Sequence, residues 1–315
     1  MPEQSARERH LVTVGAPIRL DQLLAERWDE LDRSTIRALV TEGAVLVNGE
    51  PALKAGVRIE PGDIVEVALP QLELSPPPEL PIGMAMATLY EDEVLLIVDK
   101  PSGVPVRETR RTEGPTLSQV LGAQHPDIAH VGGADRAGVV TTVDANVSGL
   151  VLVGKDEETY RELRRMVKHA AVREEYTALV EGNLRGEHVI DAPIGNVKQT
   201  RGRLAVAREG RPARTIVRGQ QHFKADGRDY TLVYVRPETS RMHQIQVHLS
   251  WYGYPIVGDH LYGSRRQPIL PDRPFLHLST LGLPHPKTGE ALLIQSRLPQ
   301  ELHSILVYLR RPKTS

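Results

Sequence analysis

Apolar residues change their spacing along the first part of the chain. Between residues 17 and 70 they recur first at helical spacing and then alternate, which predicts two short helices followed by short strands. The apolar face of the first predicted helix consists of Leu20, Leu23, Leu24 and Trp28. A second predicted helix, STIRALVTEG, can be capped by Asp32 or Ser34 and ends at Gly43.

Turn residues predict how this region continues and where it ends. Asn48-Gly49 after AVLV predicts a hairpin, and Pro61-Gly62 predicts a turn before an alternating strand. Residues 1–16 are expected to form a polar tail, and the Pro-rich segment 71–87 an extended linker. The sequence therefore predicts a small domain over residues 17–70 and a larger one over residues 88–315.

The larger region mixes strand-like and helix-like patterns, with strands in the majority. VLLIVD predicts a buried strand, Thr116 to Leu121 a short helix, and Glu157 to His169 a longer helix, which a strand over Glu175 to Glu181 follows. Two more strands are predicted in RDYTLVYVRPET and HQIQVHLSWYG, before a helix-strand-helix tail. Hairpin-length turns join many of these strands, so we expect an α+β domain with a mixed, largely antiparallel sheet.

Composition narrows the possible functions. The 315 residues include no cysteine, which excludes disulfides, thiolate nucleophiles and cysteine-based metal sites and suits a reducing cytosol. The formal net charge is −1, so any surface for a polyanion must be local. The chain begins without an apolar leader pattern, and no run approaches the roughly 20 apolar residues of a membrane span. We therefore expect a cytoplasmic, soluble protein that does not associate with a membrane.

Several kinds of catalytic site are excluded by their missing motifs. The sequence contains no glycine-rich phosphate loop, no HExxH motif and no nucleophile elbow. His243 and His248 lie five residues apart on a predicted strand, so they would point to opposite faces and share no metal. We interpret this pair as one packed and one hydrogen-bonded histidine.

One acid stands out in the stretch RAGVVTTVDANVSGL. Asp144 follows a β-prone run and precedes a turn formed by Asn, Ser and Gly. Taken alone, it can be an ordinary turn residue that bonds its own backbone. Tyr176 can be a core tyrosine with a wet tip, and Arg241 can be a surface arginine. Each of the three residues is ambiguous by itself.

Ordered motifs give these residues a context. RAGVV..VD.NVSGLVLV.K, REEYTALVEG, IDAPIG, GRPA, ETSRMHQIQVHL, YPIVGDHLYG and PHPKTGE occur in the order and at the spacing found in RluA-type pseudouridine synthases, which the region from about Thr88 to Leu309 resembles. In the small region, RLDQLLAE, RSTIRALVTEGAVLVNGE and PGDIVEV resemble the α-L RNA-binding domain first known from a small-subunit ribosomal protein.

The resemblance implies specific roles. It makes Asp144 the catalytic aspartate and nucleophile, Tyr176 the active-site tyrosine beside the uracil, and Arg241 the ion-pair partner of Asp144. It requires neither a metal nor an organic cofactor. The phosphate-facing candidates of the small domain are Arg19, Arg33, Arg37 and Lys54. That domain nevertheless contains six Lys or Arg and ten Asp or Glu, so a protein-contact module is the alternative interpretation.

The sequence also departs from the family pattern. His-Arg-Leu-Asp is usual where this chain has Thr141-Thr142-Val143-Asp144, so the arginine expected to fill the space of the flipped base is missing. Gln246 likewise replaces a second arginine of GRTHQIR. The cations that can substitute for the missing arginine are Arg107, Arg110, Arg111 and Arg136.

These patterns predict an RNA pseudouridine synthase that acts on structured RNA, with large-subunit ribosomal RNA as the expected substrate and no obligate protein partner. Two alternatives stay open. One is a catalytically weak RNA-binding or ribosome-assembly protein that keeps the fold, and the other is a synthase directed at transfer RNA. Retention of Asp144, Tyr176 and Arg241 together favours the enzyme.

Overall fold

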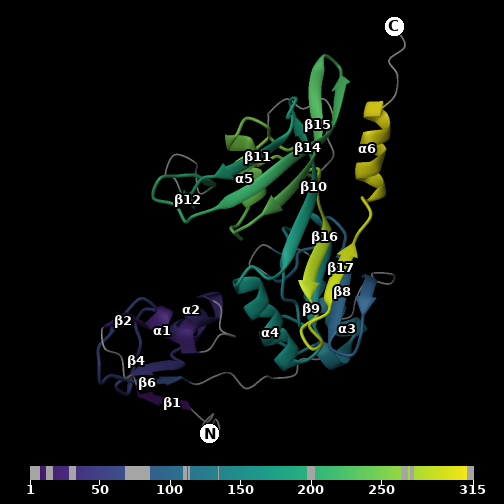
Figure 1. The fold of residues 1–315 in the computed structure, drawn as a ribbon. Helices are drawn as coiled ribbons and strands as arrows, with labels where there is room; N and C mark the ends of the chain where they lie inside the picture. Colours follow the sequence, from purple (N-terminus) through teal and green to yellow (C-terminus); the bar gives the residue numbers. More distant parts are fainter. Residues whose placement is uncertain are drawn as a thin grey trace. The chain divides into compact units, whose positions relative to one another are not determined.

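The computed structural model divides the chain into two compact units, Met1–Pro76 and Pro77–Ser315. It describes residues 8–11, 17–27, 33–67, 86–108, 112, 114–133, 135–196, 203–263, 269 and 273–310. The predicted Pro-rich linker lies almost entirely outside these residues. The two units are therefore described one at a time (Figure 1).

The first unit contains the predicted pair of helices and the small sheet. Helices α1 (Leu20–Arg27) and α2 (Arg33–Thr41) cover a core that includes Leu20, Leu24, Ile36, Val45 and Val65. Strands β3 (Val45–Val47) and β4 (Glu50–Pro51) form the predicted hairpin. Asn48 and Gly49 both have positive φ angles, 53° and 84°, as this kind of tight turn requires.

One strand of this unit lies where the sequence predicts a polar tail. Strand β1 (Glu8–Leu11) pairs with β6 (Ile64–Val67), which itself pairs with β3, so the sheet order is β1-β6-β3-β4. Strands β2 (Ile18–Arg19) and β5 (Arg58–Ile59) form a separate pair. The tail prediction is therefore wrong for residues 8–11, because four residues with little apolar pattern gain order from backbone pairing to an edge strand.

The second unit is built on a nine-stranded sheet in the described part of the chain. Its strands are β7 (Ala87–Glu91), β8 (Leu95–Lys100), β9 (Ser148–Gly154), β10 (Arg173–Glu181), β11 (Glu187–Asp191), β14 (Arg214–Ala225), β15 (Arg228–Pro237), β16 (Leu276–Pro284) and β17 (Ala291–Gln295). Their order is β11-β14-β15-β10-β16-β9-β8-β7, with β17 also paired to β16. Among these pairs, β9 with β16 is parallel and the others are antiparallel, which confirms the predicted mixed, largely antiparallel sheet.

Helices and a two-stranded ribbon complete this unit. Helix α4 (Glu157–Lys168) packs against β9, and helix α3 (Leu117–Gln124) packs against the 3-10 turn η1 (Pro126–Ile128). Thr116 and Asp156 cap α3 and α4, as their positions before apolar periodic segments suggest. Helix α5 (Gln244–Trp251) packs against β13, β14 and β15, and α6 (Gln300–Arg310) packs against β14. Strands β12 (Ile194–Asn196) and β13 (Leu204–Val206) form the ribbon.

Two secondary-structure predictions are wrong in this unit. HQIQVHLSWYG forms helix α5 and its C-terminal cap, where the alternation of Ile245, Val247 and Leu249 predicts a strand. All residues from Gln244 to Leu249 are buried, so the helix has no solvent-facing side that would show a helical period in this segment. The predicted helix-strand-helix tail is a strand, a second strand and a helix, namely β16, β17 and α6.

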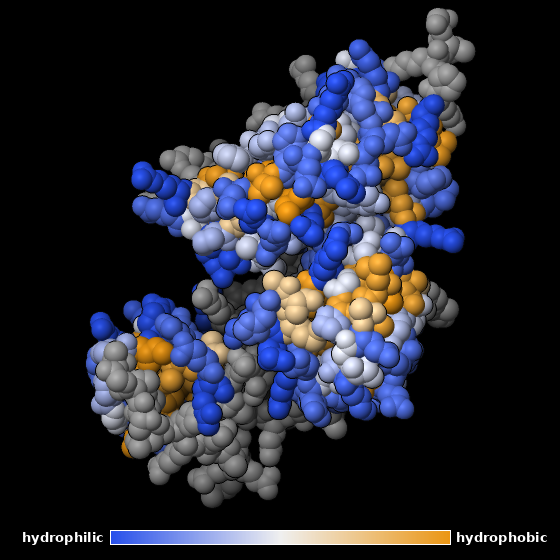
Figure 2. Space-filling model, in the orientation of Figure 1, coloured by the Kyte–Doolittle hydropathy of each residue, from blue (hydrophilic) through white to orange (hydrophobic). Residues whose placement is uncertain are grey.

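In the described residues, the structure contains no helix that is long and apolar enough to cross a membrane. Figure 2 shows that, on the face drawn, hydrophilic side chains interrupt the apolar ones over the described residues of both units.

Candidate active site

Asp144 lies in a turn that leads into β9, and its backbone is held from several sides. The Asp144 carbonyl accepts a hydrogen bond from Val147 N at 3.0 Å. Gly103 N donates to the carbonyl of Ala145 at 2.8 Å, and Ser102 Oγ donates to that of Asn146 at 3.1 Å. The described residues give the Asp144 carboxylate no hydrogen bond to its own backbone. Asp144 is therefore not an ordinary turn residue that bonds its own backbone. Hydrogen bonds to the backbone carbonyls hold the turn, and the Asp144 carboxylate stays available to a substrate.

The side chain of Lys100 also holds this turn in place. Its side chain is fully buried at the end of β8, and Nζ donates to the carbonyls of Pro101, Val104 and Ala145 at 2.9, 2.9 and 3.0 Å. The pKa of Lys100 is lowered to about 7, mainly by burial and to a smaller extent by the charge of Arg273, while Asp144 opposes both effects. Lys100 was not among the site residues predicted from the sequence. The signal available was a lysine that ends a continuous apolar run.

Gly149 allows the strand after this turn to reach its neighbour. It has a φ of +124°, and a Cβ built there would lie 2.3 Å from the carbonyl oxygen of Leu278 on β16. No other residue type fits so close an approach between backbones. The glycine therefore permits the parallel contact of β9 with β16 that fixes the Asp144 turn against the sheet.

Within the described residues, His243 is the basic side chain that lies within ion-pair distance of the Asp144 carboxylate. Its Nε2 lies 3.6 Å from Asp144 Oδ2, and its Nδ1 is 2.9 Å from the hydroxyl of Tyr262. His243 precedes α5 in a left-handed conformation with a φ of 54°, which is uncommon for a residue other than glycine. If the phenol donates to Nδ1, the tautomer of His243 carries its proton on Nε2, the nitrogen that faces Asp144.

A second acid holds this histidine arrangement in place. Asp259 is buried and accepts hydrogen bonds from Leu261 N and Tyr262 N at 2.8 and 3.0 Å. Gln246 Nε2 donates to the other oxygen of Asp259 at 3.1 Å, so the residue that replaces a family arginine keeps a polar contact here. The sequence did not predict that His243, Tyr262 and Asp259 lie at the candidate site. Their only signal was proximity to the SRMHQIQ and GDHLYG motifs.

The environment of Asp144 combines solvent access with partial burial. Its side chain is 44% exposed, yet the surrounding protein raises the pKa of the carboxyl group. His243 and Lys100 oppose that increase with their positive charge, and the negative charge of Asp259 adds to it. A substrate can therefore reach the carboxylate, although the surrounding protein limits its solvation. This combination is typical of catalytic carboxyl groups.

Tyr176 lies on β10 and faces Asp144 closely enough for the charge of Asp144 to raise its pKa. The residue is 8% exposed, and its hydroxyl donates to Glu174 Oε2 at 3.0 Å. Burial raises the pKa of Tyr176 well above its usual value, the charge and hydrogen bond of Glu174 raise it further, and Asp144 contributes least. Tyr176 is thus a neutral phenol at physiological pH.

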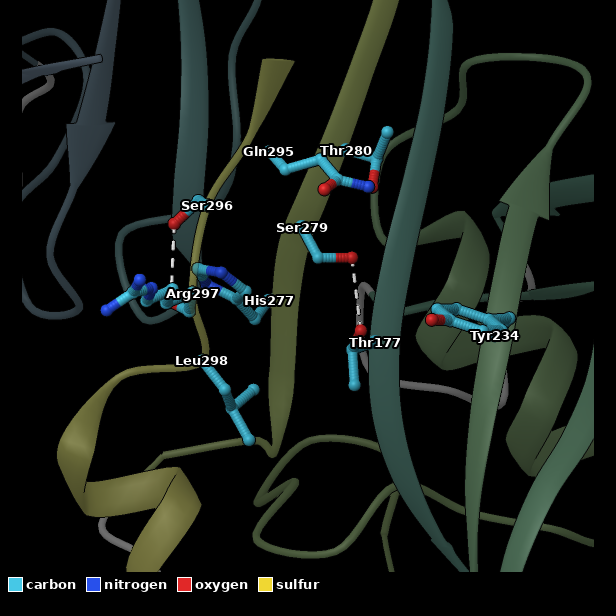
Figure 3. A pocket seen from close by; sticks show the side chains of 9 residues that line it. All are labelled: Thr177, Tyr234, His277, Ser279, Thr280, Gln295, Ser296, Arg297 and Leu298. Carbon is cyan, nitrogen blue, oxygen red and sulfur yellow. Dashed lines mark hydrogen bonds between the residues drawn. The ribbon is translucent and has the colours of Figure 1, made fainter. Parts of the chain in front are cut away.

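A β-bulge sets the direction of Tyr176. The pairing of β10 with β16 shifts between Glu175 and Tyr176, which leaves Ser279 opposite no residue of β10. The Ser279 hydroxyl donates to the carbonyl of Glu175 at 3.1 Å and accepts from Thr177 Oγ1 at 3.0 Å. Figure 3 shows these two hydroxyls pointing toward one another from adjacent strands. The bulge is therefore fastened on the face of the sheet opposite to Tyr176.

Arg241 lies two residues before His243 and is not bonded to Asp144. Both residues belong to the described part of the chain, and the expected ion pair between them is absent there. The Arg241 guanidinium donates through Nη1 to the carbonyl of Ser240 at 2.8 Å. Its Nε is buried without a hydrogen-bond partner within the described residues, so a donor near the N-terminus of α5 stays unused.

The two threonines before Asp144 differ in environment. Thr141 is 4% exposed, and its hydroxyl accepts a hydrogen bond from Leu152 N at 3.0 Å, which ties the segment to β9. Thr142 is exposed and two residues from Asp144. The position where the family usually has arginine therefore faces solvent beside the candidate catalytic acid.

The predicted RNA-contacting cations differ in their exposure to solvent. Arg19, Arg37 and Lys54 are exposed on the first unit, where Arg19 pairs with Asp21 at 2.8 Å. Arg33 begins α2, and its side chain lies outside the described residues, as do Arg110 and Arg111. Arg107 is partly buried, and Arg136 is only 4% exposed, so burial argues against Arg136 as a phosphate contact.

One cavity of the second unit lies away from this chemistry. It has a volume of about 410 Å³ and includes Thr177, Tyr234, Ser279, Ser296 and Arg297 in its lining (Figure 3). Thr177 and Tyr176 are adjacent on one strand and therefore face opposite sides of the sheet. Within the described residues, no group of three or more His, Asp and Glu side chains is placed to hold a metal ion.

Comparisons with known proteins agree with this arrangement. The family profile described as RNA pseudouridylate synthase matches residues 94–251, and the profile described as S4 domain matches residues 18–65. The chain is 35% identical over 298 residues to an uncharacterized RNA pseudouridine synthase of Bacillus subtilis (strain 168), covering 93% of this chain and 94% of the relative. It is 34% identical over 302 residues to a ribosomal large subunit pseudouridine synthase D of Nitrosomonas europaea, covering 94% of this chain and 85% of the relative.

A solved structure supports the fold. Human RNA Pseudouridylate Synthase Domain Containing 1 matches with a TM-score of 0.56 and 23% identity, over 73% of this chain and 97% of the human chain. The S4 match covers the two helices and the small sheet that the sequence predicted as an α-L domain. The chain therefore belongs to the RNA pseudouridylate synthase family, in the form that carries an N-terminal S4 domain.

Proposed function

We propose that this protein isomerises uridine to pseudouridine in large-subunit ribosomal RNA, with Asp144 as the catalytic carboxylate. The observation that carries the proposal is an exposed carboxylate without a hydrogen-bond donor in the described residues, next to His243 and within electrostatic reach of Tyr176. Relatives named ribosomal large subunit pseudouridine synthase D support ribosomal RNA as the substrate. That substrate suits the cytoplasmic location that the sequence predicts.

The first chemical step breaks the bond between uracil N1 and ribose C1′. A carboxylate at C1′ stabilises the positive charge that develops on the sugar, as one carboxylate of a glycosidase does. Asp144 suits this role because its turn is fixed by Lys100, Ser102 and Gly103, so the group is held in place before the substrate arrives. A second carboxylate at the sugar is not required, since the leaving uracil stays bound and re-adds through C5.

Tyr176 and Arg241 act on the uracil and its surroundings in this proposal. Tyr176 presents its buried phenol ring to the uracil. The uracil must stay close to C1′ while it rotates. The unused Nε of Arg241 offers a charged donor to an oxygen of the substrate or of Asp144 once RNA is bound. Protonation removes the negative charge of Asp144, so enzyme activity is expected to fall as the pH is lowered through the pKa of this carboxyl group.

The target uridine has to leave its stack to reach Asp144. Unstacking and unpairing cost a few kcal/mol, and the cost is smallest for a base that is already single-stranded. Thr142 offers no long cation to fill the space that the base leaves. We therefore place the substrate uridine in an RNA loop and not in a stable stem.

The S4 domain supplies affinity for RNA in this proposal. Arg19, Arg33, Arg37 and Lys54 remain its candidate phosphate contacts, and three of these side chains are exposed. The acidic majority of this domain means that the basic residues have to act as a local cluster. No protein partner is required for the reaction.

A matched pair of variants tests the proposal. Asp144→Asn keeps the shape of the side chain and removes its charge, whereas Asp127→Asn makes the same change at an exposed position on η1. Pseudouridines are mapped in ribosomal RNA transcribed without modification and then incubated with each protein. We expect wild type and Asp127→Asn to modify the same uridine, and Asp144→Asn to bind RNA without modifying it. Turnover by Asp144→Asn would contradict the mechanism, and binding without modification by the wild type would identify an RNA-binding protein that keeps the fold.

A further inference from the structure

Glu174 has a contact that the reaction as described leaves unexplained. Its Oε2 accepts the hydrogen bond of the Tyr176 hydroxyl at 3.0 Å. The two residues lie two positions apart on β10, so both side chains project from the face of the sheet that is directed at Asp144. The residues opposite them on β16 are Leu281 and Leu278, which contribute no polar group.

No cation neutralises Glu174 within the described residues. Arg173 pairs with Glu175, and these two neighbours lie on the other face of β10. Burial raises the pKa of the Glu174 carboxyl, and the hydrogen bond from Tyr176 opposes that increase. Across β15 the partner of Tyr176 is Val235, so the other charged group that acts on the phenol is Asp144. A carboxylate in such surroundings gains from accepting a proton.

A neutral phenol is a poor base by itself. Tyr176 cannot be ionised near neutral pH, because its pKa lies well above the usual value. A phenol oxygen accepts a proton readily only when its own proton leaves at the same time, and the hydrogen bond of Tyr176 leads that proton to Glu174. Tyr176 and Glu174 together can therefore accept a proton from a substrate, which neither residue can do alone.

We infer that Glu174 acts through Tyr176 as the acceptor of the proton that uracil C5 loses in the last step of isomerisation. This inference rests on the proposed function. Once C5 has bonded to C1′, its C–H bond breaks, the electron pair restores the C5–C6 double bond, and the pair of the N1–C6 double bond returns to N1. The released proton passes to the oxygen of Tyr176 while the phenolic proton passes to the Glu174 carboxylate. Glu174 later returns its proton to water and N1 takes up a proton from water, so atoms and charges balance without a further reagent.

The test compares Glu174→Gln with Glu175→Gln. Glutamine can still accept the hydrogen bond of Tyr176 through its amide oxygen, and it cannot take up the proton. Glu175→Gln makes the same change on the opposite face, where Glu175 contacts Arg173 and not Tyr176. Single-turnover rates are measured on RNA that carries either hydrogen or deuterium at C5 of the target uracil.

We expect Glu174→Gln to slow product formation about 10²-fold, the low end for loss of general base catalysis, and to show a larger deuterium isotope effect than the wild type. Glu175→Gln should match the wild type in rate and in isotope effect. A slower Glu174→Gln enzyme with an unchanged isotope effect would show a structural role only, and an unchanged rate would overturn the inference outright.

Tyr176→Phe provides a second variant in case Glu174→Gln does not fold. If the phenol carries the proton, Tyr176→Phe should show the same increase in isotope effect, and adding Glu174→Gln should cause no further loss. A wild-type isotope effect in Tyr176→Phe would overturn the inference. Pseudouridine formation by the wild type is read in the same assay, so failure of the proposed function is visible separately.

Discussion

Replacing Lys100 by methionine tests whether the buried ammonium holds the Asp144 turn. Methionine has a similar length and fills the same space without a donor. The change leaves the carbonyls of Pro101, Val104 and Ala145 without the three hydrogen bonds that they now receive. Hydrogen bonds that involve a charged group contribute roughly 1.5–3 kcal/mol each, and removing the cost of burying the charge offsets part of that loss.

The expected net cost is about 3–5 kcal/mol in the free energy of unfolding, which lowers the melting temperature by about 10 °C in a unit of this size. Urea unfolding followed by circular dichroism measures the change, with Lys224→Met as the control. Lys224 is exposed on β14, so its loss should change stability by no more than about 0.5 kcal/mol.

The dependence of stability on pH should also differ between wild type and Lys100→Met, in a direction that follows from the pKa of Lys100. Burial holds the folded-state pKa of Lys100 at about 7, against 10.5 for the unfolded chain. Between these values the unfolded chain binds a proton that the folded protein lacks, so wild-type stability gains a rising contribution with increasing pH. Lys100→Met should lack that contribution. Equal unfolding curves for wild type and Lys100→Met would refute the reasoning, because the three carbonyls would then be satisfied without the ammonium.

Three further predictions follow from other parts of the chain. Thr142→Arg should narrow the difference in single-turnover rate between a uridine in a loop and one in a stem, because Thr142 is exposed and leaves room for a longer side chain. Equal wild-type rates on both substrates would show that another group already helps extrude the base. Deleting residues 1–80 should weaken binding to long RNA, measured over a salt series, more than it slows turnover at saturating substrate, since the deleted S4 domain has its own core; an unchanged binding constant would favour a protein-contact role. Burial raises the pKa of Asp92, but hydrogen bonds from Tyr90, Val94, Leu95 and His285 outweigh it and hold that pKa at about 2. Because a lowered carboxyl pKa stabilises the fold above the unfolded value of about 3.9, Asp92→Asn should cost about 1–2 kcal/mol at pH 7 in urea unfolding, and a cost that stayed constant down to pH 2 would rule out this origin.

Local patterns were sufficient for much of the fold. Helices α1, α2 and α4 have an apolar stripe that neighbouring polar residues make visible, and the Asn48-Gly49 hairpin depends on two residues that tolerate positive φ angles. The order of the motifs was enough to identify Asp144 and Tyr176 as candidates, because both lie inside distinctive stretches. These features are encoded over ten to twenty residues, a distance at which sequence pattern and backbone conformation are directly linked.

Only the tertiary structure decided what surrounds those two residues. Helix α5 is buried on every side from Gln244 to Leu249, so its sequence carries no amphipathic period and its neighbours determine its conformation. His243 reaches Asp144 from a segment about a hundred residues away, and Lys100 approaches the same turn from the end of another strand. The sequence by itself named the carboxylate and the phenol. The packing of distant segments chose their partners, because burial, hydrogen bonding and charge act through space and not along the chain.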